Sequence, residues 1–220
     1  MIYCIGDSFT FGAELPDIKG DDTGLVHSNL AWPTLLGEKL KQPVKNLGHQ
    51  GSGNTRVLKR AMDCVFAGDA ELIIIAWPTP DRIEWCDEDG IYDIWAGRNI
   101  RWLSKRRQEM VEAATGDWCN EVDHWSYRRW LRNIIMLQTF FKAHGQRYIM
   151  FQTHLTQRWN MEWMNRDQDL LQHVDLTHFI DWPYNGLCEW MGDCPKGPHG
   201  HPLELGHERI ADKVYAYIRN

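Results

Sequence analysis

A serine lies close to the start of the chain, in the stretch IYCIGDSFTFG at residues 2–12. The apolar residues 2–5 predict a short buried strand, so that Ser8 stands just beyond its end. In this place a serine either caps a helix or acts as a nucleophile. Its role depends on whether the chain also supplies the partners that a nucleophile needs.

Three other segments contain such partners. The glycine-rich stretch GHQGSGN at residues 48–54 offers accessible backbone amides, WPTPDR at residues 77–82 offers polar side chains, and GPHGHPLELGH at residues 197–207 offers histidines. A nucleophile, oxyanion donors and a general base are the groups that acyl transfer requires. The sequence therefore favours Ser8 as a nucleophile.

The predicted elements bring these segments to one edge of a sheet. Apolar runs and amphipathic stripes alternate, predicting strands at residues 2–5, 44–47, 71–77 and 147–151 and helices at about residues 32–40, 57–68, 130–145 and 210–217. Helical connections require parallel pairing, which predicts a single α/β domain over residues 1–220, a three-layer sandwich with a central parallel sheet. Ligands of such sheets bind beyond the carboxyl ends of the strands.

Two segments, residues 83–125 and 154–200, lack this regular pattern. They are rich in tryptophan and charge, and we interpret them as insertions over one edge of the sheet. The chain has 12 tryptophans, most of which we expect to pack these insertions onto the sheet. The alternative is that a few line a cleft and stack on a sugar or another flat ligand. Trp130 falls on a helical stripe and is predicted to be core.

Composition excludes several partners. A net charge of −6 argues against nucleic-acid binding and against adsorption to an anionic membrane. The apolar run at residues 72–77 is too short to span a bilayer, and the first residues do not form a secretory signal. The six scattered cysteines indicate reduced thiols in a cytoplasmic protein, with Cys4 buried in the first strand. The sequence leaves the oligomeric state open.

Three of the stretches resemble a known family. GDSFTFG near the first residue, NLGHQGSGN after the second strand and HPLELGHERIA before the last helix resemble the SGNH (GDSL-type) hydrolases in order and spacing. Short proteins of this kind also occur in phage genomes. The resemblance implies a flavodoxin-like fold and hydrolysis of esters or acetyl groups on lipids, small esters and carbohydrates, without a metal or other cofactor.

The resemblance also implies roles for particular residues. Ser8 matches the family's nucleophile, and its own amide would be one oxyanion donor. Gly51 matches the glycine whose amide is a second donor. His201, directly before Pro202, matches the catalytic histidine that takes the serine proton and returns it to the leaving alcohol.

The chain departs from the family pattern at two positions. Thr79 stands where the family has an asparagine as third oxyanion donor, and Asn54 is another candidate for that role. Pro198 stands where the family's acid would lie, three residues before His201. Asp193 is the nearest upstream acid, and a backbone carbonyl could orient the imidazole instead. We therefore expect either a Ser8–His201 dyad or a triad completed by Asp193.

These observations predict a serine esterase, with an acylated carbohydrate or a small ester as candidate substrate. Two alternatives remain. The chain could be a binding module that has kept the fold and lost catalysis, or it could hold zinc through the group Cys188, Cys194, His199 and His201, although their spacing matches no common zinc site. We expect Asp7 to fix its turn through an Asx-type bond and His207 to be structural.

Overall fold

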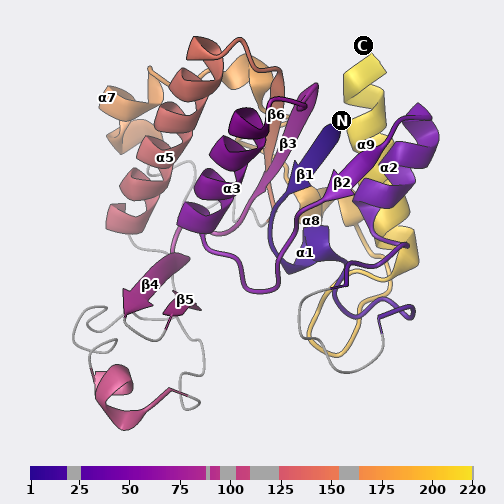
Figure 1. The fold of residues 1–220 in the computed structure, drawn as a ribbon, viewed down its shortest axis with the longest axis horizontal. Helices are drawn as coiled ribbons and strands as arrows, with labels where there is room; N and C mark the ends of the chain where they lie inside the picture. The colour runs from indigo at the N-terminus through magenta and orange to yellow at the C-terminus, as the bar shows by residue number, and fades with distance from the viewer. Residues whose placement is uncertain (19–25, 88–89, 95–102, 110–123, 154–163, 220) are drawn as a thin grey trace.

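The computed structural model describes residues 1–18, 26–87, 90–94, 103–109, 124–153 and 164–219. Within these residues the central sheet has the strand order β2 (Val44–Asn46), β1 (Ile2–Ile5), β3 (Leu72–Trp77) and β6 (Tyr148–Gln152), with each neighbouring pair parallel (Figure 1). The four predicted strands are thus confirmed.

Alternate side chains of β1, β3 and β6 enter two different cores, because neighbouring residues of a strand point to opposite faces. In β3, Ile73, Ile75 and Trp77 face one core, whereas Leu72, Ile74 and Ala76 face the other. A strand apolar on both faces needs a helical layer on each side. The sequence IIIAW meets this requirement.

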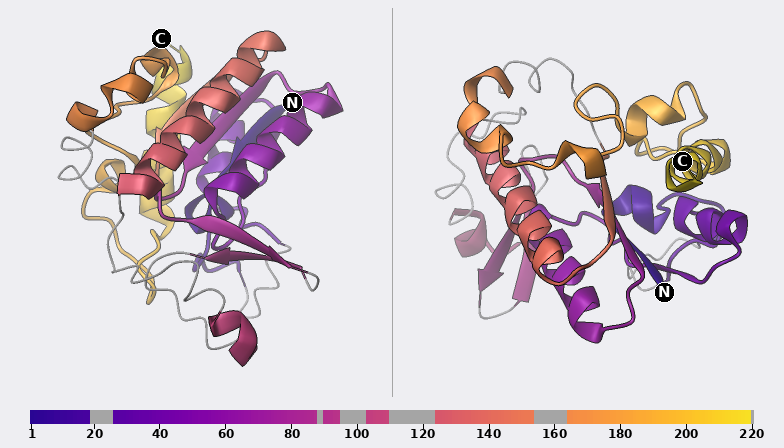
Figure 2. Two further views of the ribbon diagram at one scale, coloured as in Figure 1. Left: turned by 90° about the vertical axis from the view of Figure 1, so that its left-hand side faces the viewer. Right: turned by 90° about the horizontal axis from the view of Figure 1, so that it is seen from above.

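Two helical layers cover the sheet (Figures 1 and 2). The first core contains side chains of α3 (Asn54–Ala67) and α5 (His124–Ala143). The second contains side chains of α2 (Trp32–Leu40) and α9 (Glu204–Arg219). This arrangement confirms the predicted three-layer α/β sandwich.

Helix α5 begins earlier than predicted. The sequence placed its start near Trp130, but the helix begins at His124, and Ser126 and Tyr127 in its first turns are fully buried. Its end agrees with the prediction, since Gly145 follows Ala143 in the left-handed region at φ 62°. Trp130 and Cys4 are both inaccessible to solvent, as predicted.

The two segments predicted as insertions lie partly outside the described residues. The first contains an antiparallel hairpin of β4 (Ile83–Asp87) and β5 (Gly90–Ile94), which the sequence analysis missed. The described residues of the second include the short helices α7 (Gln168–Leu171), η1 (Leu176–His178) and α8 (Leu187–Met191). No helix among the described residues combines the length and apolar character needed to cross a membrane.

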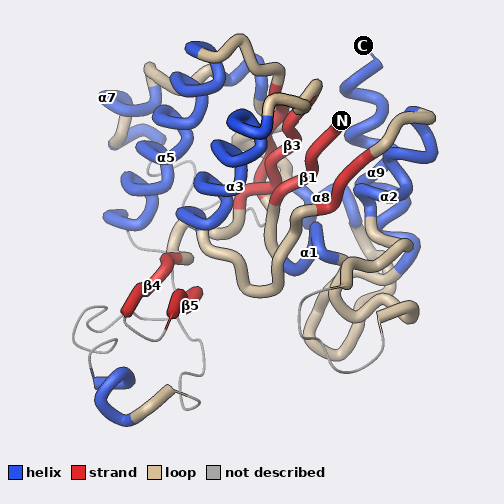
Figure 3. Tube along the Cα trace, in the orientation of Figure 1, coloured by secondary structure: helices blue, strands red, loops and turns tan. Residues whose placement is uncertain are grey.

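The loops after β1, β2 and β3, which carry most of the predicted site residues, lie at the carboxyl ends of these strands (Figure 3). Helix α1 (Ser8–Phe11) follows β1 at this edge, the glycine loop follows β2, and the hairpin follows β3. The sheet therefore presents the predicted site residues on connections rather than on the strands themselves.

Candidate active site

Ser8 is the first residue of α1, held by a local hydrogen-bond network. Asp7 is the N-cap of this helix, and its carboxylate accepts a hydrogen bond from the Phe9 N–H at 3.1 Å, which confirms the predicted Asx-type bond. The helix ends after one turn at Gly12, which lies at φ 88°. Ser8 itself is only 7% exposed.

His201 contacts Ser8 directly although 193 residues separate them. The distance from His201 Nε2 to Ser8 Oγ is 2.9 Å, which is a hydrogen bond. The imidazole also packs beside the Phe9 ring, with 5.3 Å between centroids. The segment carrying it turns back on itself, because the Gly197 N–H donates to the carbonyl of His201 at 2.9 Å.

Glu14 is the acid that faces His201, and it was not among the residues predicted from the sequence. Its Oε2 lies 2.8 Å from His201 Nδ1. Asp193, the acid considered from the sequence, has a 98% exposed side chain and pairs with Arg209 at 3.2 Å. The expected dyad, and the triad through Asp193, are therefore both replaced by a hydrogen-bonded chain of Ser8, His201 and Glu14.

The backbone around Glu14 is specialised for this contact. Glu14 lies at φ 66°, a left-handed conformation that costs a non-glycine residue on the order of 1 kcal/mol and that clusters at functional sites. On the facing loop, a Cβ at Gly197 would lie 2.7 Å from Glu14 Cδ. Glycine at position 197 thus allows the histidine loop to close over the carboxylate.

The Glu14 carboxylate accepts three N–H groups from the histidine loop. The His199 N–H donates to Oε1 at 2.9 Å, and the His201 N–H donates to Oε2 at 3.2 Å, in addition to the imidazole. Burial alone would raise the pKa of Glu14, but these hydrogen bonds and the His201 charge outweigh it and lower that pKa below its usual value. An ionised Glu14 favours a proton on Nδ1 and leaves the Nε2 lone pair to accept the Ser8 hydroxyl.

Two of the backbone amides considered as oxyanion donors have no acceptor. Within the described part of the chain, neither the Ser8 N–H nor the Gly51 N–H donates a hydrogen bond to the protein. Gly51 lies at φ 71°, a conformation that favours glycine. Both amides are therefore free to bind a ligand oxygen.

The two candidates for a third donor differ. Asn54 Nδ2 donates to the carbonyls of Thr79 at 2.8 Å and Arg82 at 3.2 Å. These two bonds use both amide hydrogens of Asn54. Its side chain therefore holds the loop after β3 and does not serve as the third oxyanion donor. The Thr79 hydroxyl makes no hydrogen bond to the described residues and stays the candidate.

A buried ion pair involves Asp7, the residue next to Ser8. Arg82 Nη1 is 3.1 Å from Asp7 Oδ2, and their side chains are 11% and 0% exposed. Since Asp7 caps α1 and Arg82 ends the loop that Asn54 holds, this pair joins the segments that follow β1 and β3.

The residues proposed as zinc ligands are not assembled. Among the described residues, no group of three or more His, Cys, Asp or Glu is placed to hold a metal ion. Both ring nitrogens of His201 are instead engaged, with Ser8 and Glu14. His207 is fully buried and its Nδ1 accepts the Trp32 N–H at 3.1 Å, which agrees with the structural role predicted for it.

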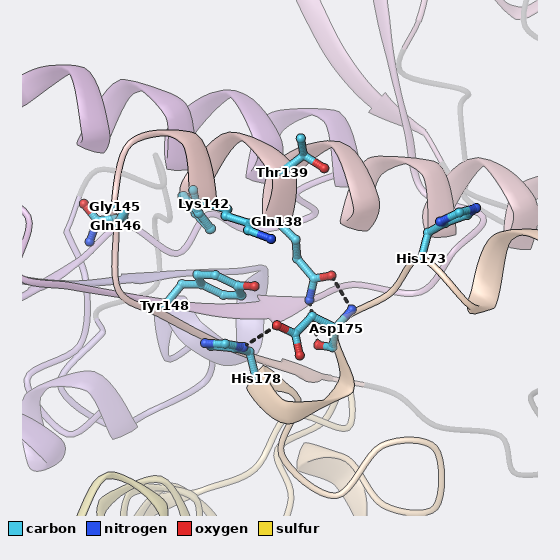
Figure 4. Close-up of a pocket in the computed structure, with 10 residues that line it drawn as sticks. Gln138, Thr139, Lys142, Gly145, Gln146, Tyr148, His173, Asp175 and His178 are labelled. Carbon is cyan, nitrogen blue, oxygen red and sulfur yellow. Dashed lines mark hydrogen bonds and ion pairs between the residues drawn. The ribbon is translucent and has the colours of Figure 1, made fainter.

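A cavity of about 510 Å³ lies apart from these residues, beside Tyr148 at the start of β6 (Figure 4). Its central polar groups bind one another. The Gln138 side chain exchanges two hydrogen bonds with the Asp175 backbone, and the Asp175 carboxylate binds His178 Nδ1 at 3.0 Å. The His178 ring stacks on Tyr148 with 4.3 Å between centroids. These contacts join α5 to η1.

Comparison with solved structures identifies the fold. No protein-family model matches the chain, and no curated protein matches it. Three structures superpose on nearly all of it, and these proteins themselves are covered over 96–98% of their length. They are a protein described as lipolytic and of the G-D-S-L family from Desulfitobacterium hafniense (16% identity, TM-score 0.51), TesA (14%, 0.58) and the psychrotrophic esterase EstA from a Pseudoalteromonas species (11%, 0.56). The chain has the fold of the SGNH hydrolases. At these identities the likeness concerns the fold, and the chemistry of this chain has to be argued from its own residues.

Proposed function

We propose that the chain is a serine esterase in which Ser8 is the nucleophile and His201 the general acid and base. The observation that carries this proposal is the hydrogen-bond chain from Ser8 Oγ through the imidazole of His201 to Glu14, with links of 2.9 and 2.8 Å. Nucleophile, base and orienting acid in this order are the arrangement that activates a hydroxyl. The psychrotrophic esterase EstA, which shares the fold, supports the same reaction class.

In the first half-reaction, Ser8 Oγ attacks the ester carbonyl carbon while His201 Nε2 takes the hydroxyl proton. The tetrahedral oxyanion accepts hydrogen bonds from the free N–H groups of Ser8 and Gly51 and from the Thr79 hydroxyl. Glu14 stabilises the imidazolium and holds its orientation. When the intermediate collapses, the bond to the alcohol breaks, His201 protonates the departing oxygen, and the acyl group stays on Ser8.

In the second half-reaction, water replaces the alcohol. His201 Nε2 takes a proton from water as its oxygen attacks the acyl carbon, and the same donors bind the oxyanion. Collapse releases the carboxylic acid and returns the proton to Ser8 Oγ. The cycle uses side chains and backbone amides only, and the active site is restored at its end.

For the substrate we propose a carbohydrate that carries a small acyl group in ester linkage, so that hydrolysis releases a small carboxylic acid. A carbohydrate esterase of family 2 from Corynascus, solved together with a carbohydrate-binding domain, shares the fold over 99% of this chain and 64% of its own length, with 13% identity and a TM-score of 0.55. A panel of acetylated sugars and short-chain p-nitrophenyl esters tests this, and a preference for long acyl chains would contradict it.

The test of the mechanism is covalent labelling with a fluorophosphonate, which reacts with activated serines. We expect one label per chain, located at Ser8 by mass spectrometry, and no label on heat-denatured protein. Ser8→Ala should abolish both labelling and ester turnover while the circular dichroism spectrum stays unchanged. Turnover that persists in this variant would remove Ser8 from the mechanism, and an unlabelled wild-type protein would favour the binding module.

A further inference from the structure

The hairpin β4–β5 contains a pair of opposed acidic residues, which is unfavourable for the stability of a β-sheet. Glu84 and Asp93 stand directly opposite each other across its two strands, with side chains only 10% and 6% exposed. Like charges at opposed positions destabilise a strand pair, and burial of a carboxylate adds a desolvation cost. Burial and the charge of Asp93 accordingly raise the pKa of Glu84. Groups outside the hairpin have to offset this cost.

The offsetting groups come from α3 and the loop before it. Arg56 on α3 lies between the two acids, with Nη2 2.9 Å from Asp93 Oδ2 and Nε 3.5 Å from Glu84 Oε1. The other oxygen of Asp93 accepts the backbone N–H of Gly53 at 2.7 Å. Asp93 therefore binds a guanidinium with one oxygen and the glycine loop with the other, whereas the contact that Glu84 makes with the described residues is the one to the guanidinium.

Gly53 is the N-cap of α3, and this helix has no side-chain cap of its own. The Asp93 carboxylate binds an N–H at the start of α3, where a negative charge is favourable. Gly53 is also two residues from Gly51, and Ser52 between them is fully buried with its N–H bound to the carbonyl of His49 at 3.0 Å. The two residues after Gly51 thus both donate their backbone N–H, Ser52 to His49 and Gly53 to Asp93 of the hairpin. These two hydrogen bonds fix the backbone next to Gly51.

We infer that Asp93 is a positioning residue of the active site, which aims the Gly51 N–H at the oxyanion from the hairpin β4–β5. This inference rests on the proposed esterase function. It assigns the hairpin, beyond the carboxyl edge of the sheet in Figure 1, to the catalytic scaffold. Loss of an oxyanion donor costs roughly a hundredfold to a thousandfold in kcat. A loop that is loosened but still present should cost less, about tenfold to a hundredfold.

The test compares Asp93→Ala with Glu84→Gln. The two residues share the hairpin, the burial and the Arg56 partner, but among the described residues it is Asp93, and not Glu84, that accepts a hydrogen bond from the glycine loop. Turnover of p-nitrophenyl acetate is measured per active site, counted by fluorophosphonate titration, so that unfolded protein does not lower the result. We expect Asp93→Ala to lower kcat about tenfold to a hundredfold with KM changed less than about twofold, and Glu84→Gln to keep kcat within about twofold.

Asp93→Asn keeps an acceptor for the Gly53 N–H, so it should recover part of the loss and also serves if the alanine variant does not fold. An unchanged kcat per active site in a folded Asp93 variant would overturn the inference and leave the esterase proposal intact. An equal loss in Glu84→Gln would overturn it too, because the effect would then come from the hairpin charge and not from the loop contact. A wild-type protein that neither labels nor turns over would instead refute the proposed function.

Discussion

Glu14→Gln is the substitution that separates the site seen in the structure from the one expected from the sequence. The change removes the charge and keeps the size of the side chain. In the protein, three N–H donors converge on the two Glu14 oxygens, from the backbone of His199 and from the backbone and imidazole of His201. A glutamine has one oxygen and an NH₂ group, so one of its ends must face a donor that it cannot bind.

Both orientations of the glutamine harm the proposed reaction. With the NH₂ toward His201 Nδ1, the imidazole takes its proton on Nε2 and cannot accept the Ser8 proton. With the oxygen toward Nδ1, the tautomer is retained but the charge that stabilises the imidazolium is lost. Removal of the acid in other serine hydrolase triads lowers kcat by about 10⁴-fold. We expect a loss of about 10³- to 10⁴-fold here, which corresponds to about 4–5.5 kcal/mol of transition-state stabilisation.

The assay is kcat/KM for p-nitrophenyl acetate, normalised by active-site titration, with circular dichroism as the check on folding. Asp193→Asn is the matched control, since that exposed side chain is neighboured by Arg209 and not by His201. We expect it to keep its activity within about twofold. A Glu14→Gln enzyme that retains a third or more of wild-type activity would refute the role of Glu14, and a thousandfold loss in Asp193→Asn would restore the acid expected from the sequence.

Two further predictions concern stability. Arg82→Met leaves the fully buried Asp7 carboxylate without the Arg82 cation and should lower the free energy of unfolding by about 3–5 kcal/mol in urea titrations. The double variant Asp7→Asn, Arg82→Met should recover stability, because it removes the buried charge as well. A loss below about 1 kcal/mol in Arg82→Met would contradict the importance of the pair. Burial, with the His201 charge, lowers the pKa of His207 to about 4. Below the ordinary imidazole pKa of about 6.5, the unfolded chain therefore binds more protons than the folded one. The free energy of unfolding should fall as the pH drops from about 6.5 to 4. Between pH 7.5 and 4.5 the loss of stability from His207 amounts to about 2.5 kcal/mol. His207→Asn keeps an acceptor for the backbone N–H of Trp32 and should remove that part of the pH dependence. If this variant loses as much stability in acid as the wild type, the pH dependence comes from other groups.

The parts of the fold that the sequence predicts are those set by local periodicity. The apolar run at residues 71–77 forms β3, and Gly145 ends α5 because both signals are carried by neighbouring residues. The hairpin was missed because its alternation is short and its inward positions include Glu84 and Asp93, which resemble a solvated face. An Asp-Gly pair at residues 89–90 between two runs of β-favouring residues was the available signal.

The parts of the site that the sequence predicts are those carried by short stretches. Ser8 was favoured by its place after the first strand, and His201 was assigned through the resemblance to the SGNH hydrolases; the structure places the two in contact. Glu14 was missed because its partner is 187 residues away and no spacing links them. Asn54 was misread because the sequence shows a polar side chain but not the carbonyls of the neighbouring loop, which use both of its amide hydrogens.

The position of the acid relative to the histidine is free to vary, because the imidazole needs only an acceptor in line with Nδ1. In this chain the acceptor comes from the segment that carries the nucleophile. The carbonyl of Ser8 accepts the N–H groups of residues 12 and 13 at 3.0 Å each, so Glu14 follows directly on the one-turn helix that starts with the serine. Ser8 and Glu14 are therefore fixed relative to one another, and His201 contacts both. Under the proposed mechanism Glu14 supplies the carboxylate that is absent at Pro198, so Pro198 by itself gives no reason to interpret the chain as a binding module.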